Sequence, residues 1–175
     1  MTASSAGNIV LIGMPAAGKS TLGVLLAKQL GYDFVDTDLL IQRHADMTLA
    51  SYLKEHGYQA LLRLEAQVIQ ALTLTHTVIA TGGSAVCSPA AMQHLQQNGH
   101  IVYLQCALGV LNRRITSMSE RGIAAASGQT LADVQQERIP LYRQFAQITI
   151  DVTDLRLEQA VTEILALLAP STLKP

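Results

Sequence analysis

The chain has 175 residues, of which 14% are charged, and a formal net charge of −1. This length suits one domain, 1–175, and the near-zero charge excludes a basic stripe for nucleic acid or a polybasic patch for a membrane surface. Hydrophobic residues make up 49% of the chain but aromatic residues only 4%, so we expect a core of Leu, Ile, Val and Ala and a small-molecule partner.

The start of the chain, residues 1–7, is small and polar and lacks the charged and apolar regions of a secretory signal. No apolar run reaches the roughly 18 residues that would indicate a membrane span. We therefore expect a cytoplasmic protein, working as a monomer. Cys87 and Cys106 have no neighbours at zinc-ligand spacing, and we interpret both as buried thiols.

The first predicted strand, Asn8 to Ile12, is a short β-branched run typical of a buried parallel strand. It leads into Gly13 to Ser20, which fits the phosphate-binding pattern Gly-x-x-x-x-Gly-Lys-Ser/Thr at every fixed position. Leucines at helical spacing then predict a helix from Lys19 to Gly31, where glycine is suited to the helix C-terminus. This pattern binds phosphate only where a strand leads into it and a helix follows it, and both flanking segments meet this requirement. The alternative is that the glycines form an incidental turn.

This pattern predicts a site for a nucleoside triphosphate. Backbone N–H groups and the helix N-terminus would hold phosphate oxygens, Lys19 would add a positive charge, and the Ser20 hydroxyl would ligate magnesium. The predicted nucleotide-binding residues are Gly13, Ala16, Ala17, Gly18, Lys19, Ser20 and Thr21.

The next strand, Tyr32 to Val35, runs into Asp36-Thr37-Asp38, where the chain should emerge at the carboxyl edge of the sheet. Three helices are expected after it: Leu39 to His44, a helix from the capping Thr48 to Gly57, and Tyr58 to Thr73.

The third strand, Thr77 to Ala80, ends in the glycine turn Thr81 to Ser84. A helix bracketed by Ser88-Pro89 and Asn98-Gly99 and a fourth strand, Ile101 to Leu104, come next.

A helical segment carrying Arg113 and Arg114 precedes a small, polar stretch without periodicity, about 116–130, which we predict to be a lid. Thr130 should cap a helix that Pro140 interrupts or kinks. A fifth strand, Gln147 to Asp151, and a closing helix complete the chain. Strands that alternate with helices predict an α/β fold: a three-layer, doubly wound, parallel five-stranded sheet with ligands at the carboxyl edge.

The phosphate-binding pattern alone does not separate kinases, GTPases and motors. The chain has no Asn-Lys-x-Asp run for reading guanine, which weighs against a GTPase. Asp36 and Asp38 fit phosphoryl transfer to an alcohol, which needs one group to hold magnesium and one to accept the hydroxyl proton. The alternative is that they only cap the next helix.

At this point the sequence resembles the shikimate kinase family, P-loop enzymes of the nucleoside-monophosphate-kinase type that phosphorylate a cyclohexene carboxylate. The resemblance covers Ile9 to about Leu168 and rests on four motifs: Gly13 to Thr21, Phe34 to Asp38, Thr81 to Gly83, and Arg-Ile-Pro-Leu-Tyr-Arg at Arg138 to Arg143.

The resemblance implies a role for each matching residue. Asp36 would hold Mg²⁺ through water, and Asp38 would contact and deprotonate the acceptor hydroxyl. Gly82 and Gly83 would offer backbone N–H groups to the acceptor. Arg138 would bind the carboxylate of the acceptor. The alternative is that Arg138 is only a solvent-exposed charge on a helix surface.

Arg121 would be the lid arginine that meets the transferring phosphate. Its alternative is a solvated loop charge, because the family's Arg-Pro-Leu-Leu is Arg-Gly-Ile-Ala in this chain.

Two further departures concern the acceptor site. Ser84 replaces the third glycine of the family's glycine turn, and Leu62 stands where the family has a second carboxylate-binding arginine, three residues before Glu65. Arg63 is adjacent, but one residue along a helix turns a side chain by about 100°.

The sequence therefore favours an ATP-dependent kinase acting on shikimate or a similar cyclic hydroxy acid. The alternatives are a P-loop kinase for another small polyol or alcohol, and an ATP-binding regulatory module without turnover.

Overall fold

The computed structural model describes residues 7–115, 118 and 121–172. Its centre is one sheet of five parallel strands in the order β2-β3-β1-β4-β5. The strands are β1 (Asn8–Ile12), β2 (Asp33–Asp36), β3 (Thr77–Ala80), β4 (Gly99–Gln105) and β5 (Ile148–Asp151). The order reverses beside β1, so the predicted doubly wound parallel sheet is confirmed.

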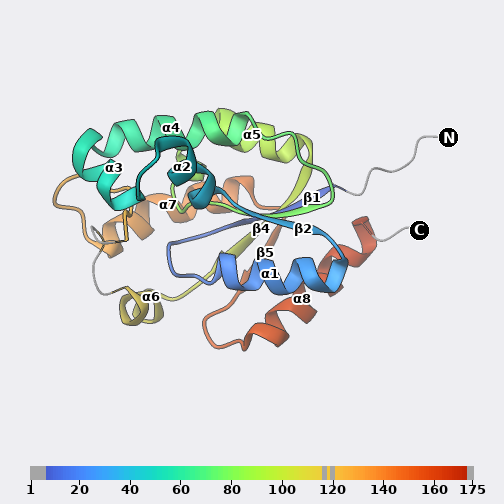
Figure 1. The fold of residues 1–175 in the computed structure, drawn as a ribbon. Coiled ribbons are helices and arrows are strands. Elements are labelled where there is room, and N and C mark those ends of the chain that lie inside the picture. Colours follow the sequence, from blue (N-terminus) through green and yellow to red (C-terminus); the bar gives the residue numbers. More distant parts are fainter. Residues whose placement is uncertain (1–6, 116–117, 119–120, 173–175) are drawn as a thin grey trace.

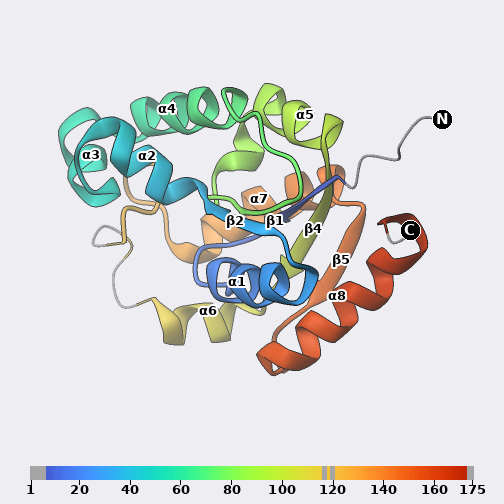
Figure 2. The same cartoon turned by 45° about the vertical axis from the view of Figure 1, so that its right-hand side comes forward.

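Helices cover both faces of the sheet and make a three-layer architecture (Figures 1 and 2). On one face lie α1 (Lys19–Leu30) and α8 (Leu157–Thr172), which contact each other; the other face carries α5 (Pro89–Gln97) and α7 (Leu131–Phe145). The short helix α6 (Leu108–Arg114) follows β4 and packs against α7.

Strand β1 forms the middle of the core because its apolar side chains are covered from both faces. All five of its residues are buried, and Val10, Leu11 and Ile12 are fully inside. Its one polar residue, Asn8, is satisfied: the side-chain amide donates to the Leu74 carbonyl at 2.7 Å and accepts from the Thr77 N–H at 3.1 Å. This covered strand holds the start of the phosphate-binding loop rigidly.

Three helices form a separate group beside the carboxyl ends of the strands: α2 (Thr37–Ala45), α3 (Leu49–His56) and α4 (Tyr58–Gln70) (Figure 1). They share a second hydrophobic cluster, distinct from the main core, that includes Ile41, Leu61 and Leu64. The buried Ala124 belongs to this cluster, so part of the predicted lid segment packs on the helix group.

Several local expectations are corrected by the structure. Helix α7 runs through Pro140 without interruption, and α4 ends at Gln70, before Thr73. Cys106 is buried as expected, but Cys87, in the short 3₁₀ helix η1 (Ala85–Cys87), is half-buried. Across the described residues, no helix combines the length and apolarity needed to cross a membrane.

Candidate active site

The phosphate-binding loop between β1 and α1 has the shape that its sequence predicts. Gly18, at the helix N-terminus, has φ 100°, and Gly13 has φ 147° with the Leu104 carbonyl so close that a Cβ would lie 2.6 Å from its oxygen. Ala16 also has a positive φ, 63°, a conformation that costs energy outside glycine and often marks a functional loop. Ala16, Gly18 and Lys19 to Thr21 line the cavity in front of the loop. Gly13 and Ala17 are buried and do not line this cavity.

Lys19 lies inside the loop, with 7% of its surface exposed. Its ammonium donates to the carbonyls of Gly13 and Met14, at 2.8 Å each. Burial lowers the pKa of Lys19 to about 8, although the carboxylates of Asp38, Asp36 and Glu65 act in the opposite direction. The loop therefore holds the Lys19 ammonium, already removed from water, beside the space where a phosphate would bind.

Ser20 and Asp36, the two residues predicted to hold magnesium, lie in hydrogen-bond contact beside the loop. The Ser20 hydroxyl donates to Asp36 Oδ2 at 2.6 Å, while Asp36 Oδ1 accepts the Asp38 N–H at 3.0 Å and caps α2. Asp36 therefore caps α2, which is the alternative role weighed from the sequence, and its other carboxylate oxygen lies against Ser20. Among the described residues, no group of three His, Cys, Asp or Glu side chains is placed so that it could hold a metal ion.

Asp38 stands in the first turn of α2 and lines the cavity. Burial is the main cause that raises the pKa of its carboxyl to about 6; the negative charge of Asp36 adds to the effect and Lys19 opposes it. A carboxylate with a pKa near the working pH is suited to accepting a proton.

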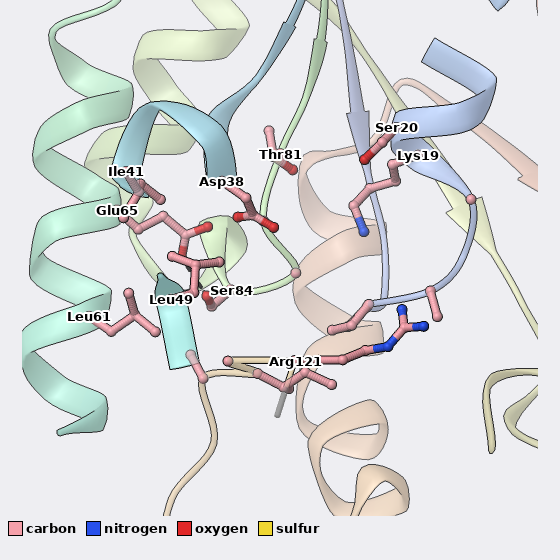
Figure 3. Close-up of a pocket in the computed structure, with 18 of the residues that line it drawn as sticks. Lys19, Ser20, Asp38, Ile41, Leu49, Leu61, Glu65, Thr81, Ser84 and Arg121 are labelled. Carbon is pink, nitrogen blue, oxygen red and sulfur yellow. Dashed lines mark hydrogen bonds between the residues drawn. The ribbon is translucent and has the colours of Figure 1, made fainter. Parts of the chain in front are cut away.

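One cavity of about 660 Å³ joins the loop to the helix group. Asp38, Glu65 and Ser84 gather on one side of it, opposite Lys19 and Ser20 (Figure 3).

Glu65 is a cavity residue for which the sequence predicted no role; there it only marked the position of Leu62 in the family motif. It is 3% exposed, and its Oε2 accepts a hydrogen bond from the Ser84 hydroxyl. Its Oε1 is buried without a hydrogen-bond partner among the described residues. Burial, and then the charge of Asp38, raises the pKa of Glu65 to about 7, and the bond from Ser84 acts against this. The available signal was a glutamate on the apolar face of α4.

Arg138 is a buried cation, not a surface helix charge. It is 3% exposed in α7, and Nη2 donates to the Ala124 carbonyl. Its Nη1 is buried and has no hydrogen-bond partner within the described part of the chain. A buried guanidinium with an unpaired N–H is costly unless a ligand meets it.

The glycine turn after β3 makes close contacts, but not all the expected ones. The Gly82 N–H donates to the Thr37 hydroxyl at 3.1 Å, so the backbone donor that we expected it to offer is already used. A Cβ on Gly82 would lie 2.2 Å from Glu65 Oε1 and 2.8 Å from Asp38 Oδ1. Gly83 also lines the cavity, and a side chain there would collide with Pro15. Glycine at these positions keeps the cavity open.

Two arginines come from the region after β4. Arg121 is exposed, lines the cavity, and extends toward the phosphate-binding loop and away from Glu65 (Figure 3). Arg114, which sequence reasoning left without a role, also lines the cavity, and its guanidinium donates to the Ala16 carbonyl at 3.0 Å. Arg114 therefore stabilises the backbone of Ala16, the loop residue with a positive φ.

Leu62 does not line the main cavity. It borders a separate small cavity of about 30 Å³ together with Glu65, Ser84 and Cys87. Arg63 is exposed and does not line the main cavity either.

The fold and the cavity define a class: a P-loop phosphotransferase of the nucleoside-monophosphate-kinase type, with the Asp38 carboxylate in the same cavity as the phosphate-binding loop. The model of the shikimate kinase family matches residues 15–169. This chain belongs to the shikimate kinase family.

Individual relatives agree over nearly the whole chain. A shikimate kinase of Caldanaerobacter subterraneus subsp. tengcongensis is 37% identical over 161 residues, which cover 90% of this chain and 94% of the relative. Shikimate kinase 2 of Yersinia enterocolitica is 33% identical over 171 residues, covering 95% and 98%. The solved structure of the Acinetobacter baumannii shikimate kinase in complex with shikimate superposes with a TM-score of 0.87 at 31% identity, covering 96% of each chain.

Proposed function

We propose that this enzyme transfers the γ-phosphoryl group of ATP to a hydroxyl of shikimate or of a similar cyclic hydroxy acid. One observation carries the choice of acceptor: Arg138 and Glu65 line one cavity, and each has a buried atom, Nη1 and Oε1, without a hydrogen-bond partner among the described residues. A ligand with both an anionic group and a hydroxyl would satisfy the two.

The nucleotide phosphates would occupy the loop between β1 and α1. Lys19 would exchange its bonds to loop carbonyls for bonds to phosphate oxygens, with a gain because the ammonium is already desolvated. Ser20 directly, and Asp36 through water, would hold Mg²⁺, which when bound neutralises phosphate charge. Arg121 points to the same region and would meet the transferring phosphoryl group.

In the transfer step the acceptor oxygen forms a bond to the γ-phosphorus while the bond from that phosphorus to the bridging oxygen of ADP breaks. Asp38 takes the acceptor hydroxyl proton. Its raised pKa, about 6, leaves the carboxylate ionised at neutral pH and more basic than an ordinary aspartate.

The acceptor carboxylate would face Arg138, and a second hydroxyl would donate to Glu65. A kinase for another polyol stays the alternative, because Leu62 is apolar and contributes no second cation. Membership of the family argues against a regulatory module without turnover.

A steady-state assay tests the proposal. ADP release with Mg²⁺ and ATP should rise with shikimate and hydroxy acids, and fall to the background for cyclitols without a carboxylate. Strong stimulation by a neutral polyol, with none by shikimate, would overturn the choice of acceptor and leave the kinase class intact. We further propose that 1–175 acts as one domain with a lid at about 116–130, as a monomer, in the cytoplasm, where ATP is supplied; light scattering tests the monomer.

A further inference from the structure

The Ser84 hydroxyl lies against the buried carboxylate of Glu65, at the point where β3 passes into η1. Ser84 is 7% exposed, and its Oγ donates to Glu65 Oε2. The two residues are separated by 19 positions and line both the main cavity and the small cavity behind it. Their bond forms part of the wall between these two spaces.

Glu65 depends on this bond because no cation contacts it. Within the described ranges, no Lys, Arg or His nitrogen lies within 4.0 Å of a Glu65 oxygen. Leu62, one turn earlier on α4, presents an apolar side chain to the same small cavity. The charges of Asp38, Arg138 and Lys19 act on Glu65 from a longer range. A buried carboxylate in this setting requires hydrogen-bond donors to stay in one orientation.

The bond to Ser84 fixes the direction of the other carboxylate oxygen. The last side-chain torsion of glutamate is broad, so without a partner the carboxylate would sample many orientations. With Oε2 held by Ser84, Oε1 lies within 2.2 Å of the point where a Cβ on Gly82 would stand, next to Asp38 Oδ1 at 2.8 Å from that point. Glu65 Oε1 and Asp38 Oδ1 therefore both lie beside Gly82, which lines the cavity.

We propose that Ser84 is a positioning residue: its hydroxyl orients Glu65 so that Oε1 binds an acceptor hydroxyl next to the one that Asp38 deprotonates. This rests on the proposed function. Ser84 itself does not touch the reacting atoms.

Ser84→Ala is a mild test, because the residue has φ −97° and ψ −2°, a conformation that alanine adopts without strain. A hydrogen bond to a charged group stabilises by an amount equivalent to roughly ten- to a hundredfold in binding, so the acceptor KM should rise about tenfold or more. The KM for ATP and kcat should change little, because the contact with Glu65 exists both before and during transfer.

Ser88→Ala is the matched control. Ser88 borders the same small cavity, but its hydroxyl caps α5 by accepting from the Ala91 N–H at 3.3 Å. This variant should lower the urea midpoint and leave the acceptor KM unchanged. The contrast separates positioning of Glu65 from a general loss of stability.

A double-mutant cycle decides whether Ser84 acts through Glu65. In a Glu65→Ala background nothing is left to orient, so adding Ser84→Ala should change the acceptor KM less than twofold. Carboxyl ¹³C NMR supplies a readout without turnover: loss of the bond should move the titration of Glu65 to higher pH.

Equal, additive effects in the cycle, an unchanged KM in Ser84→Ala, or an unmoved titration would each overturn the proposal about Ser84 while the kinase assignment stands. If the unmodified protein phosphorylates no hydroxy acid, the proposed function fails, and the role of Ser84 fails with it.

Discussion

Glu65→Gln should make the protein more stable at neutral and alkaline pH. Burial and Asp38 raise the pKa of Glu65 from 4.5 to about 7 in the folded state. Since one pKa unit corresponds to about 1.4 kcal/mol, ionised Glu65 makes the fold roughly 3 kcal/mol less stable than protonated Glu65 does. Glutamine stays neutral, has nearly the same shape, and offers a carbonyl oxygen to the Ser84 hydroxyl.

The sign follows from proton binding. The folded carboxyl holds its proton to higher pH than the unfolded one, so its favourable contribution is complete below pH 4.5 and is lost as the pH rises through about 7. The glutamine variant should exceed the unmodified protein by only about 0.4 kcal/mol at pH 4.5, by about 1.4 kcal/mol at pH 5.5, and by roughly 3 kcal/mol at pH 8.

Urea unfolding at these three pH values measures the free energy of unfolding directly, with a shared m value as the check on two-state behaviour. Glu163→Gln, an exposed site on α8, is the matched control and should give no pH-dependent difference. A gain from Glu65→Gln that is the same at every pH, or a variant less stable than the unmodified protein at pH 8, would refute the reasoning.

Three further predictions concern phosphoryl transfer. Lys19→Ala should lower kcat by at least about a hundredfold with the fold intact by circular dichroism, because the γ-phosphate loses its cation; normal turnover would contradict the loop assignment. Asp38→Asn should keep nucleotide affinity and lower kcat by about 10² to 10⁴, whereas Asp36→Asn should raise the magnesium requirement; identical behaviour would refute the division of roles. Residues 116–129 should gain protection from hydrogen exchange when nucleotide and acceptor bind, and equal protection would count against a lid.

The phosphate-binding loop and the sheet were predictable because their signals are local. An apolar run, a glycine pattern and a leucine-rich helix specify β1, the loop and α1 without reference to the rest of the chain. The carboxylates of Asp36 and Asp38 were predictable for a related reason: a parallel strand delivers the residues that follow it to the ligand edge of the sheet.

The acceptor side was less predictable because it depends on contacts between distant segments. The bond between Ser84 and Glu65 and the capture of the Gly82 N–H by Thr37 both join different elements. The buried Arg138 donates to the Ala124 carbonyl, and the segment that carries Ala124 has no periodicity to indicate this contact.

Residues 122–124, in the described part of the predicted lid, pack closely against the rest of the molecule. Ile123 and Ala124 are buried, and a Cβ on Gly122 would lie 2.6 Å from the Leu49 side chain and 2.7 Å from the Ala50 backbone. Glycine at position 122 is therefore what allows this close approach to α3. Residues 116–117 and 119–120 of the predicted lid lie outside the described residues.

Leu62→Arg tests how far the site is still adapted to a carboxylate. Leu62 stands three residues before Glu65 on α4, close enough for side chains on one helix face to interact, and borders the small cavity behind Glu65 and Ser84. That cavity of about 30 Å³ has room for about one water, so a guanidinium at position 62 reaches the acceptor only if it extends beyond this space. A charge-assisted bond to the acceptor carboxylate should lower the KM for shikimate by about ten- to a hundredfold at similar kcat, as added uniform binding does.

Gln67→Arg is the matched control, since it adds the same charge at an exposed position of α4 and should leave the KM unchanged. If both variants lowered the KM equally, the effect would be general attraction of an anion. If Leu62→Arg left shikimate phosphorylation undetectable while a neutral polyol turned over well in the unmodified protein, the acceptor would be that polyol. Leu62 would then be a specificity residue that keeps a second cation away from a site with Arg138 as its one buried guanidinium among the described residues.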